Sequence, residues 1–333
     1  MDRHLLIVGS GSVGKRHARN LRQLGCRISA VDPREDRLNE LAAEGPTEGI
    51  FSTLGAALAV GVAYDGVVVG SPPSAHVEQC LACIAAGVPV LLEKPVSPDL
   101  ATATRLADAA RAAGVPVLLG YTWRWWPPLR RVRSLIAEGK VGALRHVQFH
   151  MSAHLADWHP WEPYQDFFMA SQAQGGGALL DESHWIDLAL WLFGLPLSVS
   201  ARVEKLSDLE IGTDDNVDML LEYPGRLRVA IHLDIFGRPH EKFIRFVGER
   251  GSILWTASPN RITVSGEIEG WPESHDFACD RNDMFVAVAE EFLAVLDGGL
   301  VQACSLDDGL SVLAVVEAAR RSSAEGRVQP VVA

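Results

Sequence analysis

The sequence predicts an α/β protein of two domains, in which a doubly wound parallel sheet is followed by an α+β domain with a large, mostly antiparallel sheet. Three observations predict this fold class. A glycine-rich turn at 9–14 separates an apolar run from a helical pattern. Apolar strands then alternate with helices as far as residue 121, which is typical of a parallel sheet covered on both faces. Strand patterns dominate beyond that point, and 333 residues exceed the roughly 100–200 of one domain.

The N-terminal elements follow one another in a regular order. Residues 4–9 form a short apolar run, which predicts a buried strand, and the segment near 13–24 has apolar residues at helical spacing. The next apolar run, 27–32, ends in an acid and completes one βαβ unit. The same alternation predicts strands at 66–71, 88–95 and 115–121, with helices at about 74–86 and 98–113. We therefore expect a first domain over 1–121.

The second domain, expected over 122–333, is rich in strands. Its strand patterns lie at 144–154, 197–205, 216–223, 226–236, 242–248, 252–257 and 260–266. Short Gly or Pro turns, such as the one at 223–226, favour an antiparallel meander. Helices at about 177–193, 281–297 and 306–323 complete the α+β pattern.

Composition excludes several classes of protein. A hydrophobic content of 48% with 22% charged residues is ordinary for a folded globular chain. The net charge of −12 argues against nucleic acid or an anionic membrane as a partner, and no apolar run approaches the ~18 residues of a membrane helix. Five cysteines, an odd number, do not make a disulfide framework, and the N-terminal apolar run breaks too early for a signal peptide. We expect a cytoplasmic protein.

The glycine-rich turn predicts a dinucleotide site. Gly9, Gly11 and Gly14 leave a strand and open a helix, and Asp32 ends the following strand. Glycines let backbone amides approach a pyrophosphate at the helix N-terminus, as in the Rossmann fold. A carboxylate at Asp32 accepts hydrogen bonds from both ribose hydroxyls and repels a 2′-phosphate, which favours NAD over NADP. Arg34 could rest on the adenine or neutralise a phosphate, and the plainer alternative is a βα turn with a solvated acid.

Two residues suit hydride transfer from an alcohol, which needs one group to hold the hydroxyl oxygen and one to take its proton. Lys94 ends a strand at the carboxyl edge of the parallel sheet, where open α/β sheets bind ligands. A histidine side chain ordinarily titrates near neutrality, which suits His184 to this task, and on a continuous helix over 177–193 Asp181 and Asp187 would each lie about 60° from it. A solvated lysine and a core histidine are the plainer alternatives. The two acids and the preceding triple glycine favour a site.

Six motifs, in order along nearly the whole chain, resemble the Gfo/Idh/MocA oxidoreductases, the family of glucose–fructose oxidoreductase and inositol dehydrogenase. They are GSPPSAH (70–76), LLEKPVS (91–97), YTWRWWP (121–127), DWHPWEPY (157–164), GGGALLDESHWIDLALWLFG (175–194) and DRNDMF (280–285). The resemblance implies an active-site lysine at Lys94, followed by a cis peptide to Pro95, and a catalytic histidine at His184. Together with the glycine turn it implies a cofactor site made of Gly9, Gly11, Ser12, Val13, Gly14, Asp32, Arg34, Ser71, Pro72, His76, Glu93, Lys94 and Arg124.

The loop from 157 to 174 ends beside the expected catalytic helix, so its polar and aromatic side chains are expected to reach the substrate. With the resemblance, this loop predicts a substrate site made of Lys94, Tyr121, Trp158, His159, Tyr164, Asp181 and His184. A structural cover or a subunit contact is the alternative. Asp181, a further catalytic candidate, departs from the commoner family pattern, because it precedes His184 by three residues and Leu180 holds the usual position.

Two other clusters are interpreted as structural. Histidines alternate along the polar face of the strand at 144–154, which could approach the pocket or form a subunit contact, but they lack a carboxylate or thiolate at a metal-ligand spacing. Cys80 and Cys83 share one face of a helix in an apolar stretch, which favours core packing over a metal site. We expect no metal.

Taken together, these patterns predict an oxidoreductase that uses NAD, with NADP as the less favoured cofactor. It would interconvert a secondary alcohol and a ketone on a sugar, nucleotide sugar or cyclitol, with Lys94 and His184 as acid/base and orienting groups. An NAD-dependent glycosidase that uses transient oxidation and elimination is the alternative, and a non-catalytic nucleotide-binding regulator is a third. The resemblance also implies a homodimer or homotetramer.

Overall fold

The chain folds into two compact units. The computed structural model describes residues 3–158, 160, 162–267 and 270–332. The first unit contains Met1–Trp125 and Arg281–Leu310, and the second contains Trp126–Asp280 and Ser311–Ala333. The segment 281–310 therefore differs from the expected division at residue 121. It belongs to the first unit because its helix α9 (Arg281–Leu296) packs against helix α1 (Ser12–Gln23).

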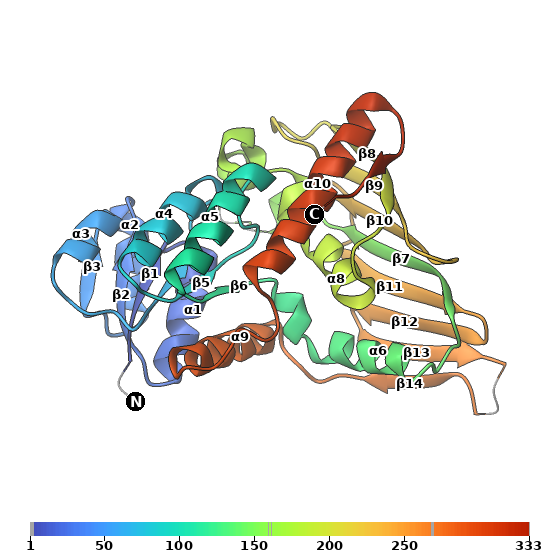
Figure 1. Cartoon of the computed structure of the whole chain (residues 1–333), viewed down its shortest axis with the longest axis horizontal. Helices are drawn as coiled ribbons and strands as arrows, with labels where there is room; N and C mark the ends of the chain where they lie inside the picture. Colours follow the sequence, from blue (N-terminus) through green and yellow to red (C-terminus); the bar gives the residue numbers. More distant parts are fainter. Residues whose placement is uncertain (1–2, 159, 161, 268–269, 333) are drawn as a thin grey trace. The chain divides into compact units, whose positions relative to one another are not determined.

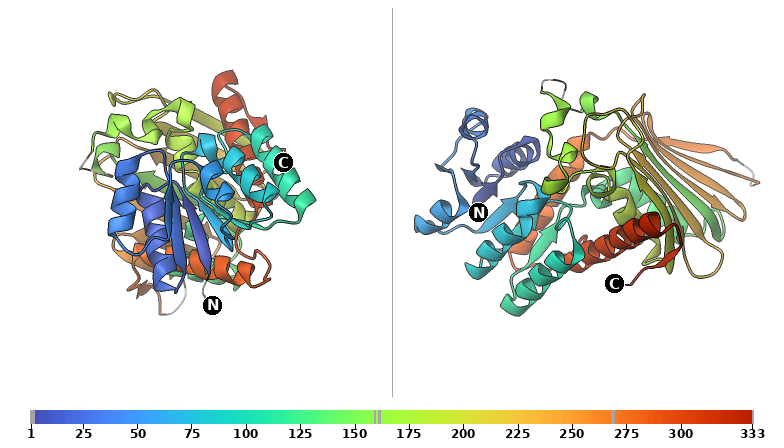
Figure 2. Two further views of the ribbon diagram at one scale, coloured as in Figure 1. Left: turned by 90° about the vertical axis from the view of Figure 1, so that its left-hand side faces the viewer. Right: turned by 90° about the horizontal axis from the view of Figure 1, so that it is seen from above.

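The first unit is built around a parallel sheet with the strand order β3-β2-β1-β4-β5-β6. The strands are β1 (His4–Val8), β2 (Arg27–Val31), β3 (Gly49–Phe51), β4 (Gly66–Val69), β5 (Val90–Leu92) and β6 (Val117–Leu119). The helices besides α1 and α9 are α2 (Glu35–Ala43), α3 (Leu54–Ala59), α4 (Pro73–Ala85) and α5 (Leu100–Ala113), with a 3-10 helix η1 (Thr122–Trp125). The strand order runs outward from β1 in both directions and helices lie on both faces, so the doubly wound sheet is confirmed (Figure 1, Figure 2).

Apolar side chains explain the central strands of this unit. Strands β1, β4, β5 and β6 are buried along their whole length, as expected for strands covered on both faces. Gly66 begins β4 against α9, where a Cβ atom would lie 2.9 Å from the Phe292 ring. Strand β3 was not predicted, because it has three residues, none of them fully buried, and so carries little apolar signal.

The second unit contains a nine-stranded sheet with the order β14-β13-β12-β11-β7-β10-β9-β8-β15. Its strands are β7 (Leu144–Ser152), β8 (Ser198–Glu204), β9 (Asn216–Glu222), β10 (Arg228–Asp234), β11 (Glu241–Gly248), β12 (Gly251–Ala257), β13 (Asn260–Gly266), β14 (Glu273–Asp276) and β15 (Gln329–Pro330). Among the pairings of the described strands in this sheet, only β7–β10 is parallel, so the predicted mostly antiparallel sheet is confirmed.

One face of the large sheet carries the helices of this unit. They are α6 (Pro127–Ala137), α7 (Ala178–Asp181), α8 (His184–Phe193) and the part of α10 (Leu306–Glu325) that lies in the unit (Figure 1). Val147, Phe149 and Met151 of β7 are buried on the helix side, and the residues between them are not. This alternation follows from the two-residue period of a strand, and no helix of the described residues covers the other face.

The single helix predicted over 177–193 is wrong, because the structure contains two helices, α7 and α8. The break falls at Glu182 and Ser183. There the Trp185 indole donates a hydrogen bond to the buried Glu182 carboxylate at 2.9 Å, and the Ser183 hydroxyl donates to the Leu180 carbonyl at 2.7 Å. These local bonds tighten the chain, so the 60° geometry expected between Asp181 and His184 does not apply.

Candidate active site

The glycine turn brings three backbone segments into close contact. Gly9 has φ +91°, and a Cβ atom there would lie 2.6 Å from the Ser71 backbone nitrogen, which follows β4. A Cβ atom on Gly14 would lie 1.8 Å from the Gly9 carbonyl oxygen. Side chains at these positions would separate β1, α1 and the end of β4, so the two glycines keep the turn compact.

The residues of this turn fit a dinucleotide pyrophosphate. Helix α1 begins after Gly11 with no side-chain cap and no acid in its first turn, so its N-terminal amides face no competing carboxylate within the helix. The Ser10 hydroxyl is buried and has no hydrogen-bond partner among the described residues. An orphaned hydroxyl beside a helix N-terminus suits a phosphate oxygen. Ser12 and Val13 are the first two residues of the same helix.

Asp32 holds the turn in place. Its carboxylate accepts hydrogen bonds from the Ser10 backbone amide at 2.7 Å and from the Arg34 backbone amide at 2.9 Å, and it is 4% exposed. Each carboxylate oxygen has a second lone pair, so both remain able to accept a ribose hydroxyl. The Arg34 guanidinium pairs instead with the exposed Asp36.

Lys94 follows β5 at the carboxyl edge of the parallel sheet and is half-buried. The Lys94–Pro95 peptide is cis, as the resemblance implies. Glu93, the preceding residue, turns its carboxylate toward His17 of α1, with 2.7 Å between Oε1 and Nε2. Burial would raise the pKa of Glu93, but the hydrogen bond with His17 and the nearby charges hold it below its usual value.

His76 joins the turn after β4 to the lysine segment. Its fully buried ring lies 2.8 Å from the Pro95 carbonyl oxygen at Nδ1 and 2.7 Å from the Ser71 carbonyl oxygen at Nε2. Burial lowers the pKa of His76, and the hydrogen bonds to the Pro95 and Ser71 carbonyls act in the opposite direction. Pro72 precedes α4 directly, and the Ser71 hydroxyl donates to Gln79 at 2.5 Å.

Arg124 and Tyr121 are buried in the first unit. The Arg124 guanidinium donates to the Ala303 carbonyl at 2.6 Å and to the Asp308 carboxylate at 3.2 Å, and it is 4% exposed. The Tyr121 side chain is fully buried. These contacts tie η1 to the segment 303–308, a role that the sequence did not indicate because the partners lie about 180 positions away.

The second unit contains the other catalytic candidates. His184 is the first residue of α8 and is half-buried, whereas Asp187 of the same helix is fully buried. Asp181 ends α7 and is 7% exposed. Lys94 and His184 thus belong to different units, and the three residues Asp181, His184 and Asp187 belong to one.

Among its described residues, the segment 155–174, which leads into α7, contains four short 3-10 helices. They are η2 (Leu155–Asp157), η3 (Tyr164–Asp166), η4 (Phe168–Ala170) and η5 (Gln172–Gln174). His159 lies outside the described residues. The Trp158 indole nitrogen is buried without an acceptor among the described residues.

Tyr164 borders a cavity of about 340 Å³. The cavity is lined by His154, Tyr164, Ser207, Asp208, Leu209 and Phe236. His154 accepts a hydrogen bond from the Ala156 amide at Nδ1, and burial lowers its pKa, so the neutral ring carries its proton on Nε2. The sequence did not identify His154 or the segment 207–209 as site residues, since nothing local marks three loops that converge only in the fold.

The remaining sequence interpretations concern metals and membranes. Cys80 and Cys83 are both buried in α4, as core packing predicts. Within the described residues, no three His, Cys, Asp or Glu side chains are grouped so as to hold a metal ion. Among the same residues, no helix combines the length and apolar character needed to cross a bilayer.

Two family models match successive parts of this chain. Residues 3–121 match the family model "Oxidoreductase family, NAD-binding Rossmann fold", and residues 129–254 match the "GFO/IDH/MocA C-terminal domain". An inositol 2-dehydrogenase of Saccharopolyspora erythraea is 28% identical over 338 residues, which cover 99% of this chain and 96% of that protein.

Solved structures extend the similarity to the fold. GenD2 of gentamicin A biosynthesis, solved with NAD, is 25% identical, with a TM-score of 0.85 over 100% of this chain and 97% of that one. Levoglucosan dehydrogenase with NADH has a TM-score of 0.88 over the full length of both chains, at 17% identity. The matches to both domain models and the full-length relatives show that this chain is an NAD-binding oxidoreductase of the Gfo/Idh/MocA family.

Proposed function

We propose that the protein interconverts a secondary alcohol and a ketone on a sugar-like or cyclitol substrate, with its first unit binding NAD and its second unit binding the substrate. The observation that carries the proposal is Lys94, a half-buried lysine two residues beyond the end of β5, in the same unit as the glycine turn and at the same sheet edge. The inositol dehydrogenase relative and the polar cavity beside Tyr164 support the class of substrate.

The proposed chemistry divides between a cofactor and two side chains. A bound NAD would supply the acceptor for the hydride of the carbinol carbon. Lys94 donates a hydrogen bond to the alcohol oxygen and holds it as the C=O bond forms. His184 takes the hydroxyl proton, so the products are the ketone and a protonated imidazole, which later returns its proton to water. Asp181, three residues before His184, is proposed to assist it by charge.

The substrate contacts are proposed to come from the loop that precedes α7. Tyr164 and Trp158 present a phenol and an indole on this loop, and the neutral His154 offers an Nε2–H donor to the same cavity as Tyr164. The Tyr164 hydroxyl, the His154 Nε2–H and the Asp208 carboxylate can form hydrogen bonds with the hydroxyls of a sugar-like ring. The Phe236 ring can pack on its C–H face. His159 is retained as a candidate from the sequence.

A screen for NADH formation against sugars, cyclitols and nucleotide sugars tests this function. Lys94→Met and His184→Ala should lower kcat on the substrate found by about 100-fold or more, with NAD affinity nearly unchanged. Lys140→Met and His146→Ala, which alter a lysine and a histidine in other parts of the second unit, are matched controls. Near-full activity of both site variants would contradict the roles, and release of a leaving group without net NADH would instead indicate a glycosidase.

We also propose a homodimer or homotetramer that associates through the helix-free face of the large sheet. Leu220 of β9 is 45% exposed on that face, where it is paired with Ala230 of β10 and Ser200 of β8. Light scattering should give two or four chains for the native protein, and Leu220→Arg should reduce that number. A monomeric native protein would contradict the proposal.

A cytoplasmic location is proposed from the cysteines. None of the five forms a disulfide within the described residues, and four of them are buried. Free thiols are typical of a reducing compartment. Fractionation of the producing cells would test this location.

A further inference from the structure

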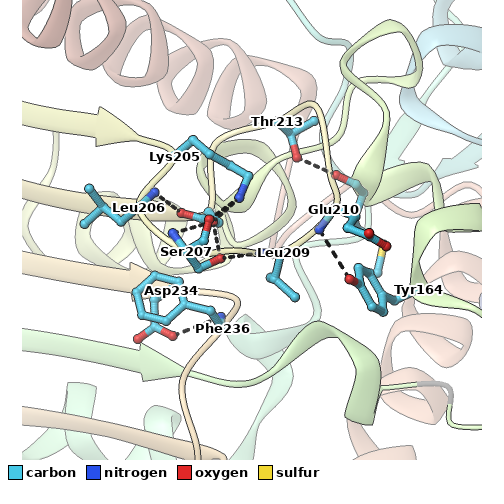
Figure 3. A network of polar contacts seen from close by, with 11 residues as sticks. Tyr164, Lys205, Leu206, Ser207, Leu209, Glu210, Thr213, Asp234 and Phe236 are labelled. Atoms are coloured by element: carbon cyan, nitrogen blue, oxygen red, sulfur yellow. Dashed lines mark hydrogen bonds and ion pairs between the residues drawn. The ribbon is translucent and has the colours of Figure 1, made fainter.

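The loop between β8 and β9, residues 205–215, is held from inside by a buried carboxylate. Asp215 is fully buried and accepts hydrogen bonds from the Leu206 amide at 2.7 Å, the Ser207 amide at 3.1 Å and the Ser207 hydroxyl at 2.5 Å. The Lys205 ammonium adds a contact at 3.1 Å. Burial would raise the pKa of Asp215, but these donors hold it below its usual value. The loop therefore has a defined shape (Figure 3).

The loop 205–215 is hydrogen-bonded to the segment 155–174, which leads into α7. The Glu210 amide donates to the Tyr164 hydroxyl oxygen at 3.3 Å, and the Thr213 hydroxyl donates to the Met169 carbonyl at 2.9 Å (Figure 3). The Gly212 amide donates to the Ala170 carbonyl at 3.2 Å. The loop 205–215 thus lies along the segment that leads into α7.

Asp214, which follows Thr213 in the loop, holds the start of α7 in place. Its carboxylate accepts a hydrogen bond from the Leu179 amide at 2.8 Å, and its backbone carbonyl accepts one from the Ala178 amide at 3.0 Å. Helix α7 has no cap of its own, because its first flanking residue is Gly177. Asp214, from a segment 35 positions away, supplies the missing acceptor.

Gly177, which has no side chain, leaves room for the Asp214 carboxylate. Its φ is +109°, and a Cβ atom there would lie 2.3 Å from Asp214 Oδ1. No side chain fits between the two residues, so the glycine allows the carboxylate to reach the helix. This pairing gives the last glycine of the motif GGG a specific structural reason.

Backbone hydrogen bonds between nearby residues connect the start of α7 to the region of Asp181 and His184, the catalytic candidates. The Asp181 amide donates to the Gly177 carbonyl at 3.0 Å, and the Ser183 amide donates to the Leu180 carbonyl at 3.3 Å. His184 follows directly. A change at the start of α7 therefore moves Asp181 and His184 together.

We propose that Asp214 is a positioning residue that sets the orientation of Asp181 and His184, acting through the start of α7. This inference rests on the proposed function, because it assumes that His184 acts on the substrate. It does not require Asp214 to touch substrate or cofactor.

The test compares Asp214→Ala, which removes the acceptor, with Asp214→Asn, which keeps one acceptor oxygen. The main readout is the histidine side-chain NMR spectrum, in which the His184 signal is assigned by its loss in His184→Ala. The second readout is the division of the effect between kcat and KM for the substrate found in the screen. Glu204→Ala, an exposed acid at the end of β8, is the control.

The proposal predicts that Asp214→Ala shifts the His184 signal and lowers kcat by about 10-fold or more, with the NAD dissociation constant unchanged. In Asp214→Asn, the His184 signal and kcat should both lie close to those of the native protein. In Glu204→Ala, both should be unchanged. If Asp214→Ala does not fold, Asp214→Glu replaces it, since it keeps the charge but displaces it from the Leu179 amide.

Two results would overturn the proposal. One is a folded Asp214→Ala protein with an unchanged His184 signal, and the other is a lowered melting temperature with no change in that signal or in kcat. The NMR readout needs no substrate. A screen that yields no NADH would therefore contradict the proposed function, while the His184 signal would still decide the role of Asp214.

Discussion

His17 and Glu93 form a buried hydrogen bond of 2.7 Å that ties the helix after the glycine turn to the strand end before Lys94. The His17 side chain is fully buried and that of Glu93 is 9% exposed. Space for this carboxylate exists because residue 120 is glycine, where a Cβ atom would lie 3.2 Å from the Glu93 carboxyl group. The bond therefore holds the helix after the glycine turn against the residue that precedes Lys94, the lysine proposed to contact the substrate.

Removing one partner should cost stability. His17→Ala leaves a buried carboxylate without its donor, a loss of about 1–3 kcal/mol, and should lower the melting temperature of the protein. Glu93→Gln keeps a hydrogen-bonding group and should lower it less. Differential scanning calorimetry measures both, with the exposed His146→Ala as the control. Equal melting temperatures for His17→Ala and the native protein would show that the bond contributes nothing.

The same pair predicts a dependence of stability on pH. The pKa of Glu93 in the folded protein lies below its ordinary value of 4.5. Its ionised form therefore stabilises the fold fully above about pH 4.5, and this contribution is lost as the pH falls through the lower folded value. The difference in melting temperature between native protein and Glu93→Gln should shrink in that acid range. A difference that stays constant there would contradict the assignment.

Asp32 should determine the choice of cofactor. Asp32→Ala removes the acceptor for the ribose hydroxyls as well as the anchor of the Ser10 amide, and two bonds to a charged group predict about a 10-fold or greater loss of NAD affinity. Affinity for NADP should change less, because the lost carboxylate also repels a 2′-phosphate. Fluorescence titration measures both, with the exposed Glu35→Ala as the control. Tighter binding of NADP than NAD by the unmodified protein would sink the idea.

The features predicted correctly from the sequence are those that neighbouring residues determine. Strand β1 is apolar at nearly every position, and the glycine turn follows it directly. The cis Lys94–Pro95 peptide was implied by the family resemblance, which rests on a contiguous motif. The alternation of strands and helices also gave the doubly wound sheet, because parallel strands need crossover helices.

The features that the sequence did not predict depend on distant partners. The segment 281–310 joined the first unit because α9 fits against Gly66, which no local pattern reveals. The helix over 177–193 breaks because a buried side-chain bond between Glu182 and Trp185 competes with the helical pattern. Asp214 reaches α7 from 35 positions away, so its role emerges only when the chain is folded.

The cysteines predict a simple pattern of chemical reactivity. Cys26, Cys80, Cys83 and Cys304 are buried, whereas Cys279 is partly exposed. Burial also raises the pKa of Cys80 and raises that of Cys83 to about 12, so neither forms a thiolate near neutral pH. A thiol reagent should modify one cysteine per native chain quickly and five after denaturation. Cys279→Ser should abolish the fast reaction, and rapid modification of that variant would contradict the burial pattern.

His232, on the helix-free face of the large sheet, should remain protonated at neutral pH. Its Nε2 lies 3.1 Å from the Asp234 carboxylate and its Nδ1 lies 2.7 Å from that of Asp218. The hydrogen bond with Asp234 and that with Asp218 outweigh burial and raise the pKa of His232 to about 9. The neighbouring His150 ring stacks on it at 5.1 Å, and burial together with the His232 charge lowers the pKa of His150.

The raised pKa of His232 predicts how the stability of the fold changes with pH. The unfolded-state pKa of a histidine is about 6.5, so the charged His232 stabilises the fold fully below pH 6.5, and the contribution is lost as the pH rises through about 9. NMR titration should place the His232 pKa near 9 in the native protein and closer to 6.5 in Asp218→Asn, which removes one charged partner. The difference in melting temperature between these two proteins should therefore shrink between pH 6.5 and 9, whereas His146→Ala, a change to an exposed histidine on β7, should show no such trend. A native His232 that titrates near 6.5 would mean that the two carboxylates do not hold its proton.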